Sequence, residues 1–359
     1  MVKILFESSI FLHQKVGGVS KYIIHLNENL GKYKVSSKIF SPITINDYLI
    51  NKKNIIFFLK FKNIPKFCRK LFFLINNLLT FIYIKINKPD ILHFSYYNKS
   101  LIKFINIPYI LTVYDLIHEK LNYHQKEFEK KELITKAKHI ICISEETKKD
   151  LIKIYKIKKK NISVIYLGGP ELKKKIFNKK DKFILYVGDR GRYKNFNNFI
   201  KAFSKSKFLT KNYKIICYGG GMFNNSEMKS FENLNIKKNI KYEKGDDTKL
   251  MNFYKNASLY VSLSNFEGFG LTILEALNMK CPVICSDIPV FKEIFRKSCK
   301  YVNIKNTKSI KSGIESILKS KKQQKKLFVQ SKLITKQLTW KRCAYATSEI
   351  YKKILRNEI

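Results

Sequence analysis

The sequence predicts an α/β fold made of two Rossmann-like domains, and three observations support this prediction. A chain of 359 residues is long enough for two domains of ordinary size. Short apolar runs, typical of buried parallel strands, alternate with helical patterns, and the alternation begins again near the middle of the chain. Glycine-containing turns stand between several strands and the helices that follow them, as at the opening of a Rossmann-like unit.

The first domain is predicted at residues 1–168. Its strand patterns are residues 2–7, 35–40, 90–94, 109–113, 139–143 and 162–166. Gly17 and Gly18 lie in the loop after the first strand, ahead of a helical pattern, so this loop is expected to face a ligand cleft. Ser144 is the predicted N-cap of a later helix. The glycine-rich residues 167–170, with the lysine-rich stretch after them, are the predicted linker.

Residues 55–85 differ from the rest of the first half because they mix lysine and arginine with large apolar side chains. Pro65 should break this stretch and leave a helix at residues 66–85. Its apolar surface is too broad for a fully solvated helix, and Asn76 and Asn77 interrupt it. Two interpretations stay open: a membrane-surface segment with basic flanks and aromatic anchors, or a helix packed on the sheet of the first domain.

Polar residues follow two strand patterns of the first domain. His93 lies at the end of residues 90–94, and Tyr114, Asp115 and His118 follow residues 109–113. Ligands gather at the carboxyl ends of the strands in doubly wound sheets, so these four side chains are candidates for a binding cleft.

The second domain is predicted at residues 169–337, and a C-terminal helical segment follows at 338–359. The strand patterns of this domain are residues 183–187, 214–218, 240–243, 257–263 and 282–286. The turn after the first of them holds Arg190, Arg192 and Lys194, which are well placed to neutralise a phosphate group. Three consecutive glycines after the second strand let the backbone pass close to a nucleotide base.

Residues 262–287, SLSNFEGFGLTILEALNMKCPVICSD, are the most informative stretch. A strand, a glycine turn, a helix at residues 271–278 and a second strand make one βαβ unit. The first N–H groups of the helix have no partner inside it, and the helix dipole is positive there. The predicted phosphate site comprises Gly268, Phe269, Gly270 and Leu271.

Two carboxylates frame this phosphate site. Glu267 lies on the turn and Glu275 lies about two helical turns later. Each would repel phosphate, so both are better suited to accept hydrogen bonds from the hydroxyl groups of a sugar and a ribose. The combination indicates a site for a nucleotide sugar. The alternative is an ordinary turn, with Glu275 on a solvated helix face.

Composition limits the other functions. The net charge of +44 invites a nucleic-acid interpretation, but only six of the 71 basic residues are arginine, the preferred residue for base and bidentate phosphate contacts. No nucleic-acid module is recognisable. Seven scattered cysteines indicate free thiols in a reducing cytoplasm, and we expect neither a signal peptide nor a spanning helix. No metal-ligand pattern is visible in the sequence.

The pattern from Glu267 to Glu275, E-G-F-G-L-x-x-x-E, resembles the donor-site motif of the family 4 retaining glycosyltransferases of the GT-B fold. Residues 188–195, GDRGRYKN, resemble the loop of that family whose Arg and Lys hold the donor diphosphate. Lys194 falls on the motif Lys. Tyr193 occupies the motif Arg position, so we assign the arginine role to Arg190 in preference to Arg192.

A third segment of the same family resembles residues 112–119, TVYDLIHE. The family has a His near the donor sugar where this chain has Tyr114, whereas the neighbouring Asp115 is kept. His118, three residues on from Asp115, is the candidate that substitutes for that His.

The resemblance implies two Rossmann-like domains that face each other across a cleft, with the C-terminal helix crossing back to the first domain. It implies a metal-independent hexosyltransferase without a cofactor, which moves a sugar from a UDP- or GDP-sugar, with retention, to a saccharide or lipid-linked saccharide in cell-envelope polysaccharide synthesis. The implied catalytic residues are Asp115, His118, Lys194 and Glu267. The implied donor-binding residues are Gly17, Gly18, Arg190, Lys194, Gly268, Phe269, Gly270, Leu271 and Glu275.

We further expect a cytoplasmic protein at the inner face of the membrane, in contact with anionic lipid and without a nucleic-acid partner. Two other functions remain open at this stage. One is a sugar-nucleotide epimerase on the same fold, which needs no second sugar. The other is a non-catalytic protein that binds polyanions through its charge.

Overall fold

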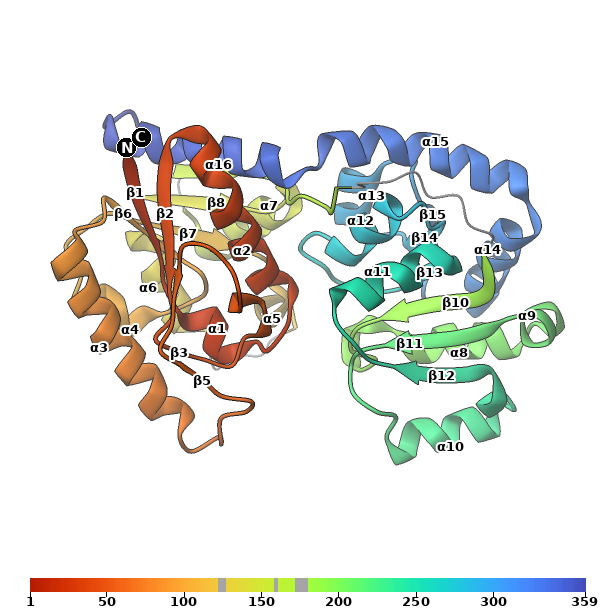
Figure 1. Cartoon of the computed structure of the whole chain (residues 1–359). Helices are drawn as coiled ribbons and strands as arrows, with labels where there is room; N and C mark the ends of the chain where they lie inside the picture. The colour runs from red at the N-terminus through yellow and green to blue at the C-terminus, as the bar shows by residue number, and fades with distance from the viewer. Residues whose placement is uncertain (122–126, 158–160, 172–179) are drawn as a thin grey trace. The chain divides into compact units, whose positions relative to one another are not determined.

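A computed structural model describes residues 1–121, 127–157, 161–171 and 180–359, and in it the chain divides into two compact units (Figure 1). Unit 1 comprises Met1–Gly168 and Trp340–Ile359, and unit 2 comprises Gly169–Thr339. Each unit has its own parallel sheet with a hydrophobic core around it. The prediction of an α/β fold with Rossmann-like domains is confirmed.

The main sheet of unit 1 has seven parallel strands in the order β4-β2-β1-β6-β7-β8-β9. They are β1 (Val2–Phe6), β2 (Val35–Phe40), β4 (Ile55–Ile56), β6 (Ile91–Phe94), β7 (Tyr109–Val113), β8 (His139–Cys142) and β9 (Ile162–Val164). β1 pairs with β2 on one side and with β6 on the other, so the strand order reverses there. Such a switch point, at the carboxyl ends of the strands, is where doubly wound sheets bind ligands.

The helices of unit 1 are α1 (Ser9–His13), α2 (Gly18–Leu30), α3 (Arg69–Asn87), α4 (Lys99–Ile102), α5 (Ile117–Lys120), α6 (Glu127–Lys136), α7 (Glu145–Tyr155) and α16 (Trp340–Leu355). Ser144 caps α7 as predicted, since its hydroxyl accepts a hydrogen bond from the Thr147 N–H. The sequence analysis missed α1 and the small sheet of β3 (Ile43–Thr44) and β5 (Leu59–Lys60). These elements have two to five residues, too few for a periodic signal.

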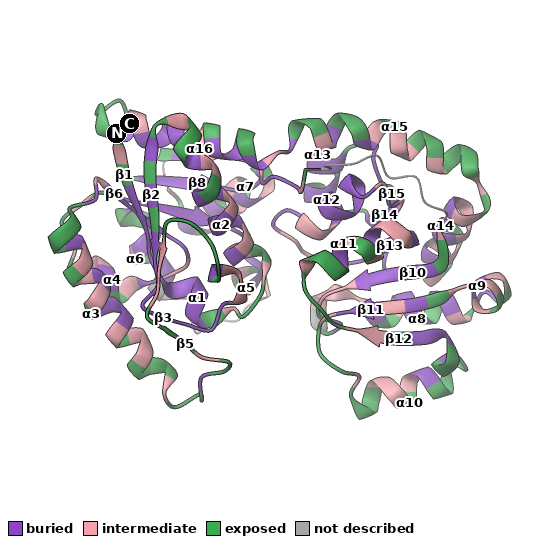
Figure 2. Cartoon of the chain, in the orientation of Figure 1, coloured by how far each residue is buried: buried purple, intermediate pink, exposed green. Residues whose placement is uncertain are grey.

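α3 begins at Arg69, three residues later than predicted, and packs on unit 1 through one face. The Asn76 amide accepts from the Ile43 N–H and donates to the Ile43 carbonyl, each at 2.9 Å, which anchors α3 to β3. The packed-helix interpretation is thus confirmed for this face. The other face exposes a stripe of Leu71, Leu74, Leu78, Ile82 and Ile86, and Figure 2 shows buried and exposed segments alternating along the helix.

α16, the last helix of the chain, belongs to unit 1. The Trp340 ring stacks on His25 of α2 at 4.9 Å between centroids, and the Tyr33 hydroxyl donates to the Lys341 carbonyl at 3.0 Å. The Tyr351 side chain is fully buried and reaches the sheet at His93. The helix therefore contributes core to a domain whose other residues, Met1–Gly168, precede the whole of unit 2 in the sequence.

Unit 2 has six parallel strands in the order β12-β11-β10-β13-β14-β15. They are β10 (Asp181–Val187), β11 (Lys214–Tyr218), β12 (Ile240–Glu243), β13 (Ala257–Ser262), β14 (Val283–Ser286) and β15 (Lys300–Val302). The helices are α8 (Phe196–Ser204), α9 (Lys207–Asn212), α10 (Asn225–Asn233), α11 (Asp247–Asn256), α12 (Leu271–Asn278), α13 (Pro289–Phe295), α14 (Thr307–Lys319) and α15 (Lys321–Gln337). The strand order reverses between β10 and β13, which are paired in parallel, so their turns meet at one edge.

Candidate functional site

The turn between β13 and α12 is shaped by Gly270, the N-cap of α12. Gly270 has φ +97°, in the left-handed region, and a Cβ there would lie 2.8 Å from the Phe291 ring. Glycine is therefore required both by the backbone and by packing against α13. Residues 268–270 are buried, and the first turn of α12 contains no acidic residue. The positive end of the helix dipole is thus not offset by a carboxylate in the first turn of α12.

Lys194 and Glu267 meet at this edge of the sheet. Lys194 ends a short 3₁₀ turn after β10, and its Nζ lies 2.5 Å from Oε1 of Glu267, on the turn after β13. The Asn265 N–H also donates to the Tyr193 carbonyl at 2.7 Å, which ties the two turns together. Burial lowers the pKa of Lys194, but the Glu267 carboxylate outweighs it, so the pKa of the ammonium group is raised. Lys194 is a permanent cation at the carboxyl ends of the strands.

Glu275 lies on the buried side of α12, with 3% of its surface exposed. Its Oε2 is 3.5 Å from the hydroxyl of Tyr254, a fully buried residue of α11. The alternative of a solvated helix face is therefore wrong. Burial, with Tyr260 and the Glu275 carboxylate nearby, raises the pKa of Tyr254 well above its usual value, so the phenol stays a hydrogen-bond donor.

Arg190, the predicted diphosphate ligand, is buried and bonded to other residues of unit 2. It is 7% exposed, and its Nε donates to Oε1 of Glu227 at 2.7 Å. Its terminal nitrogens donate to the carbonyls of Gly219, Gly221 and Met222 at 3.0–3.2 Å. The guanidinium group is thus engaged in holding the glycine run after β11, and its assignment as a donor ligand stays a prediction. Of Arg192 the structure describes only the backbone.

The glycine run that Arg190 holds is left-handed throughout. Gly219, Gly220 and Gly221 have φ of +75°, +72° and +83°. A Cβ on Gly220 would lie 2.3 Å from the carbonyl oxygen of Gly188, on the turn after β10. The turns after β10 and β11 therefore pack backbone against backbone, which only glycine allows.

In unit 1, the three predicted residues after β7 have different surroundings. The Tyr114 ring is buried and its hydroxyl donates to the Ser95 carbonyl at 3.1 Å. Asp115 accepts from the Ile117 N–H at 3.2 Å, at the start of α5. His118, on α5, lines a cavity of this unit. Tyr114, at the family His position, thus links the ends of β6 and β7.

For three other predicted residues of unit 1, Gly17, Gly18 and His93, no contact among the described residues indicates a ligand site. Gly17 is the N-cap of α2, with φ 173°, extended backbone that any residue adopts, and Gly18 begins the helix. His93 is fully buried, with Nδ1 2.6 Å from the Tyr351 hydroxyl and Nε2 2.8 Å from Oγ1 of Thr112. Burial lowers the pKa of His93 to about 3, so it is a neutral core residue. Its assignment to a cleft was wrong.

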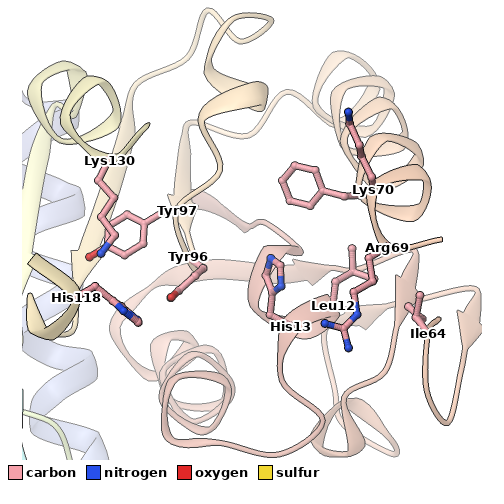
Figure 3. A pocket seen from close by; sticks show the side chains of 10 residues that line it. Leu12, His13, Ile64, Arg69, Lys70, Tyr96, Tyr97, His118 and Lys130 are labelled. Atoms are coloured by element: carbon pink, nitrogen blue, oxygen red, sulfur yellow. The ribbon is translucent and has the colours of Figure 1, made fainter. Parts of the chain in front are cut away.

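The cavity that His118 lines has a volume of about 280 Å³ and lies at the carboxyl ends of β1, β6 and β7 (Figure 3). We call it the unit 1 cavity. Its lining residues are Leu12, His13, Ile64, Arg69, Lys70, Phe73, Tyr96, Tyr97, His118 and Lys130. Sequence reasoning found only His118 among them, although Tyr96 and Tyr97 follow a predicted strand end, which was a usable signal.

Glu7, at the end of β1, is a functional candidate that the sequence analysis missed. The carboxylate is fully buried and accepts from the N–H and hydroxyl groups of Ser9 at 2.8 and 2.6 Å. It also accepts from the N–H and hydroxyl groups of Ser95 at 2.9 and 2.7 Å, and from the Tyr96 N–H at 3.1 Å. Glu7 therefore fixes the loops after β1 and β6 beside the unit 1 cavity. The sequence did carry a signal for Glu7, since a carboxylate directly after an apolar strand is unusual enough to mark a candidate site residue.

Comparison with known families covers both units. Residues 169–332 match the family model described as Glycosyl transferases group 1, and residues 16–168 match the one described as Glycosyltransferase Family 4.

Two curated relatives match about half of the chain. The O-antigen chain mannosyltransferase RfbU of Salmonella typhimurium is 31% identical over 188 residues, 51% of this chain and 52% of that protein. The N-acetylgalactosamine-N,N'-diacetylbacillosaminyl-diphospho-undecaprenol 4-alpha-N-acetylgalactosaminyltransferase of Campylobacter jejuni is 26% identical over 203 residues, 54% of each chain. The chain thus spans about half the length of these relatives.

Solved structures match over nearly the whole chain. Sucrose-phosphate synthase from Thermosynechococcus elongatus has a TM-score of 0.81 at 16% identity, covering 99% of this chain and all of that one. HepE of Anabaena, in complex with UDP and glucose, has a TM-score of 0.76 at 12% identity, covering 98% and 100%. At these identities the similarity shows the fold alone.

Proposed function

The chain belongs to the family 4 glycosyltransferases of the GT-B fold, and from this premise we propose that it transfers a sugar from a nucleoside-diphosphate sugar to a saccharide acceptor. The observation that carries the proposal is the Lys194–Glu267 pair, at the carboxyl ends of the adjacent strands β10 and β13 and beside the start of α12. A cation and a helix N-terminus at one point suit a diphosphate leaving group.

In the proposed reaction the bond between the anomeric carbon and the diphosphate breaks, and a bond to an acceptor hydroxyl oxygen forms on the same face. The acceptor proton passes to the leaving diphosphate. Lys194 and the first N–H groups of α12 stabilise the charge that develops on the diphosphate, an effect commonly worth several kcal/mol. Glu267 accepts hydrogen bonds from the donor sugar, and Glu275 accepts them from the ribose.

We propose the finer features with the same mechanism. The transfer is retaining, the donor is a UDP- or GDP-sugar, and the sugar moved is a hexose. The nucleotide sugar is a substrate, and Lys194 supplies positive charge without a metal ion or a separate cofactor. Activity that survives EDTA supports metal independence, and activity that EDTA abolishes and Mg²⁺ restores contradicts it.

The acceptor is proposed to bind unit 1, at the unit 1 cavity. The aromatic side chains Phe73, Tyr96 and Tyr97 line it, and such rings pack against sugar faces. The names of the two relatives above place their acceptors in O-antigen and diphospho-undecaprenol glycan synthesis. We therefore propose a saccharide or lipid-linked saccharide of cell-envelope polysaccharide synthesis, with Asp115 and His118 on the acceptor side.

Peripheral contact with an anionic membrane follows from the outer face of α3, and it would locate the protein in the cytoplasm at the inner membrane face. The stripe of Leu71, Leu74, Leu78, Ile82 and Ile86 is 42–73% exposed. Arg69 and Lys70 flank it at one end and Lys85 and Lys88 at the other, which suits acidic head groups. By length and composition α3 could also cross a membrane, but Asn76 and Asn77 anchor its other face.

Two experiments test these proposals. Thermal unfolding with UDP-, GDP- and ADP-sugars should identify one stabilising donor, and nucleoside diphosphate should be released only when acceptor is added. Conversion of the sugar nucleotide without an acceptor would instead indicate an epimerase. For the membrane, Leu74→Ser with Leu78→Ser should abolish sedimentation with vesicles that contain phosphatidylglycerol. Equal sedimentation of the variant and the parent would contradict the role of α3.

A further inference from the structure

The unit 1 cavity gathers residue types that are rare in this chain. The sequence holds only six arginines and six histidines, yet Arg69, His13 and His118 line the same cavity. The abundance of lysine in the chain does not explain this clustering. Lys70 and Lys130 line it as well, and none of the lining residues that the structure describes is acidic.

No ion pair among the described residues of unit 1 neutralises the positive charge at one wall of the cavity. Lys130 pairs with Glu119 at 2.8 Å and lies 4.5 Å from the centre of the Tyr97 ring, so its charge is already compensated. Arg69 and Lys70 are exposed, and neither forms an ion pair with any carboxylate in the described part of the chain. They are therefore available to an anion.

The N-terminus of α3 adds to this positive potential. Arg69 and Lys70 are the first two residues of a 19-residue helix whose first turn has no acidic residue. The side chain of the N-cap, Cys68, makes no capping hydrogen bond to the helix. Two cations at the positive end of a helix dipole destabilise the helix, and an anion bound there relieves the repulsion.

The rest of the cavity combines apolar and aromatic side chains with His13, His118 and Lys130. Figure 3 shows His13 and Tyr96 between the cations of α3 and the pair of His118 and Lys130. The Tyr97 hydroxyl is buried and has no hydrogen-bond partner among the residues that the structure describes. The cavity, of about 280 Å³, has room for a small anionic group such as a diphosphate.

We propose that the unit 1 cavity binds the diphosphate group that joins an acceptor saccharide to its lipid, with Arg69 and Lys70 holding the phosphate oxygens. This inference rests on the proposed glycosyltransferase function. The apolar stripe of α3 does not line the cavity but begins at Leu71, next to Lys70 in the helix, and in this proposal a lipid attached to the diphosphate leaves the cavity past Lys70 and lies along the stripe. Binding one anionic group in this way would select lipid-linked acceptors over neutral free saccharides.

The test measures binding of geranyl diphosphate to the full chain by calorimetry. Arg69→Gln with Lys70→Gln should raise its Kd at least tenfold, because two charge-assisted hydrogen-bond donors are lost. The matched control is Lys62→Gln with Lys66→Gln, which removes the same charge from exposed residues outside the cavity and should change the Kd less than twofold. Equal losses in the two variants, or no binding to the parent protein at 1 mM, would overturn the proposal.

Two further probes distinguish a diphosphate attached to a lipid from free inorganic pyrophosphate. Geranyl diphosphate should bind at least tenfold tighter than inorganic pyrophosphate, and geraniol should not bind. Equal affinity for the two diphosphates would overturn the lipid assignment.

Failure of this inference and failure of the proposed function remain distinguishable. Lys194→Ala should leave the Arg69-dependent binding of geranyl diphosphate intact, and it should remove the thermal stabilisation of the protein by the nucleotide sugar. If the nucleotide sugar stabilises the protein but the binding of geranyl diphosphate does not depend on Arg69, the cavity assignment is refuted and the transferase proposal is not. Arg69-dependent binding without any donor stabilisation refutes the transferase proposal.

Discussion

The Nζ atom of Lys194 lies 2.5 Å from Oε1 of Glu267, although 73 residues separate them in the sequence. The two side chains meet because β10 and β13 are neighbours in the parallel sheet, with Leu185 opposite Tyr260, and the turn after each strand leaves at the same edge. The two charges compensate each other in the structure, and in the proposed reaction Glu267 turns to the donor sugar and leaves the Lys194 cation to the diphosphate.

Lys194→Ala should lower turnover at least tenfold, because the cation that faces the developing diphosphate charge is removed. Initial rates at saturating donor and acceptor measure this, together with thermal unfolding to show that the fold survives. The control is Lys237→Ala, which breaks an ion pair with Glu232 in which both side chains are about half exposed. Unchanged kinetics in Lys194→Ala would contradict the site assignment.

Glu275→Gln should raise the KM for the donor about tenfold or more, since a hydrogen bond to a charged group is worth about 1.5–3 kcal/mol. The amide keeps the size of the side chain, and its oxygen can still accept from Tyr254. The expected pattern is a large change in the donor KM and a small one in the acceptor KM. Glu232→Gln, on an exposed carboxylate of the same unit, provides the comparison.

Arg190→Lys should destabilise unit 2 by about 2–4 kcal/mol, because a lysine cannot satisfy Glu227 and the glycine carbonyls together. Urea unfolding measures this loss. If Arg190 were instead a diphosphate ligand, Arg190→Lys would leave the free energy of unfolding unchanged and weaken donor binding.

Gly220→Ala should cost more stability than Gly221→Ala. Both glycines have positive φ, so each substitution carries about 1–2 kcal/mol of backbone strain. At Gly220 the new methyl group would also lie 2.3 Å from the Gly188 carbonyl oxygen, whereas at Gly221 it would meet nothing within 4 Å. Equal unfolding free energies for the two variants would show that the turns after β10 and β11 do not pack as described.

Stability should fall as the pH falls from 6.5 towards 4, in part because of His93. Its pKa is about 3 in the folded protein and about 6.5 when unfolded, so between these values only the unfolded chain takes up the proton. The free energy of unfolding then falls by up to about 1.4 kcal/mol per pH unit.

His93→Phe tests this pH dependence. The variant should be less stable at pH 7, since Tyr351 and Thr112 lose a partner, but its stability should depend less on pH between 4 and 6. Urea unfolding at three pH values in that range measures the slope. A slope equal to that of the parent protein would rule out His93 as a contributor.

Local pattern was sufficient for most of the fold. Apolar runs and glycine turns located most strands to within a few residues, and α12 begins and ends at the predicted residues, whereas the helices α6, α10 and α11 were not predicted. The motif around Glu267 and Glu275 indicated a nucleotide-sugar site, because a glycine turn before a helix and flanking carboxylates are close in sequence. The short elements β3, β4 and β5 were missed, since two residues carry no periodic signal.

The sequence by itself determined the α/β class and the residue types near the donor edge, because periodicity and turn chemistry are properties of neighbouring residues. Only the tertiary structure decided what Arg190, His93 and Glu7 do. Each of these polar side chains is buried, and a buried polar group must satisfy its hydrogen bonds with whatever the fold brings beside it. Those partners lie on other strands and loops, up to 258 residues away in the case of His93 and Tyr351, where no local pattern reaches.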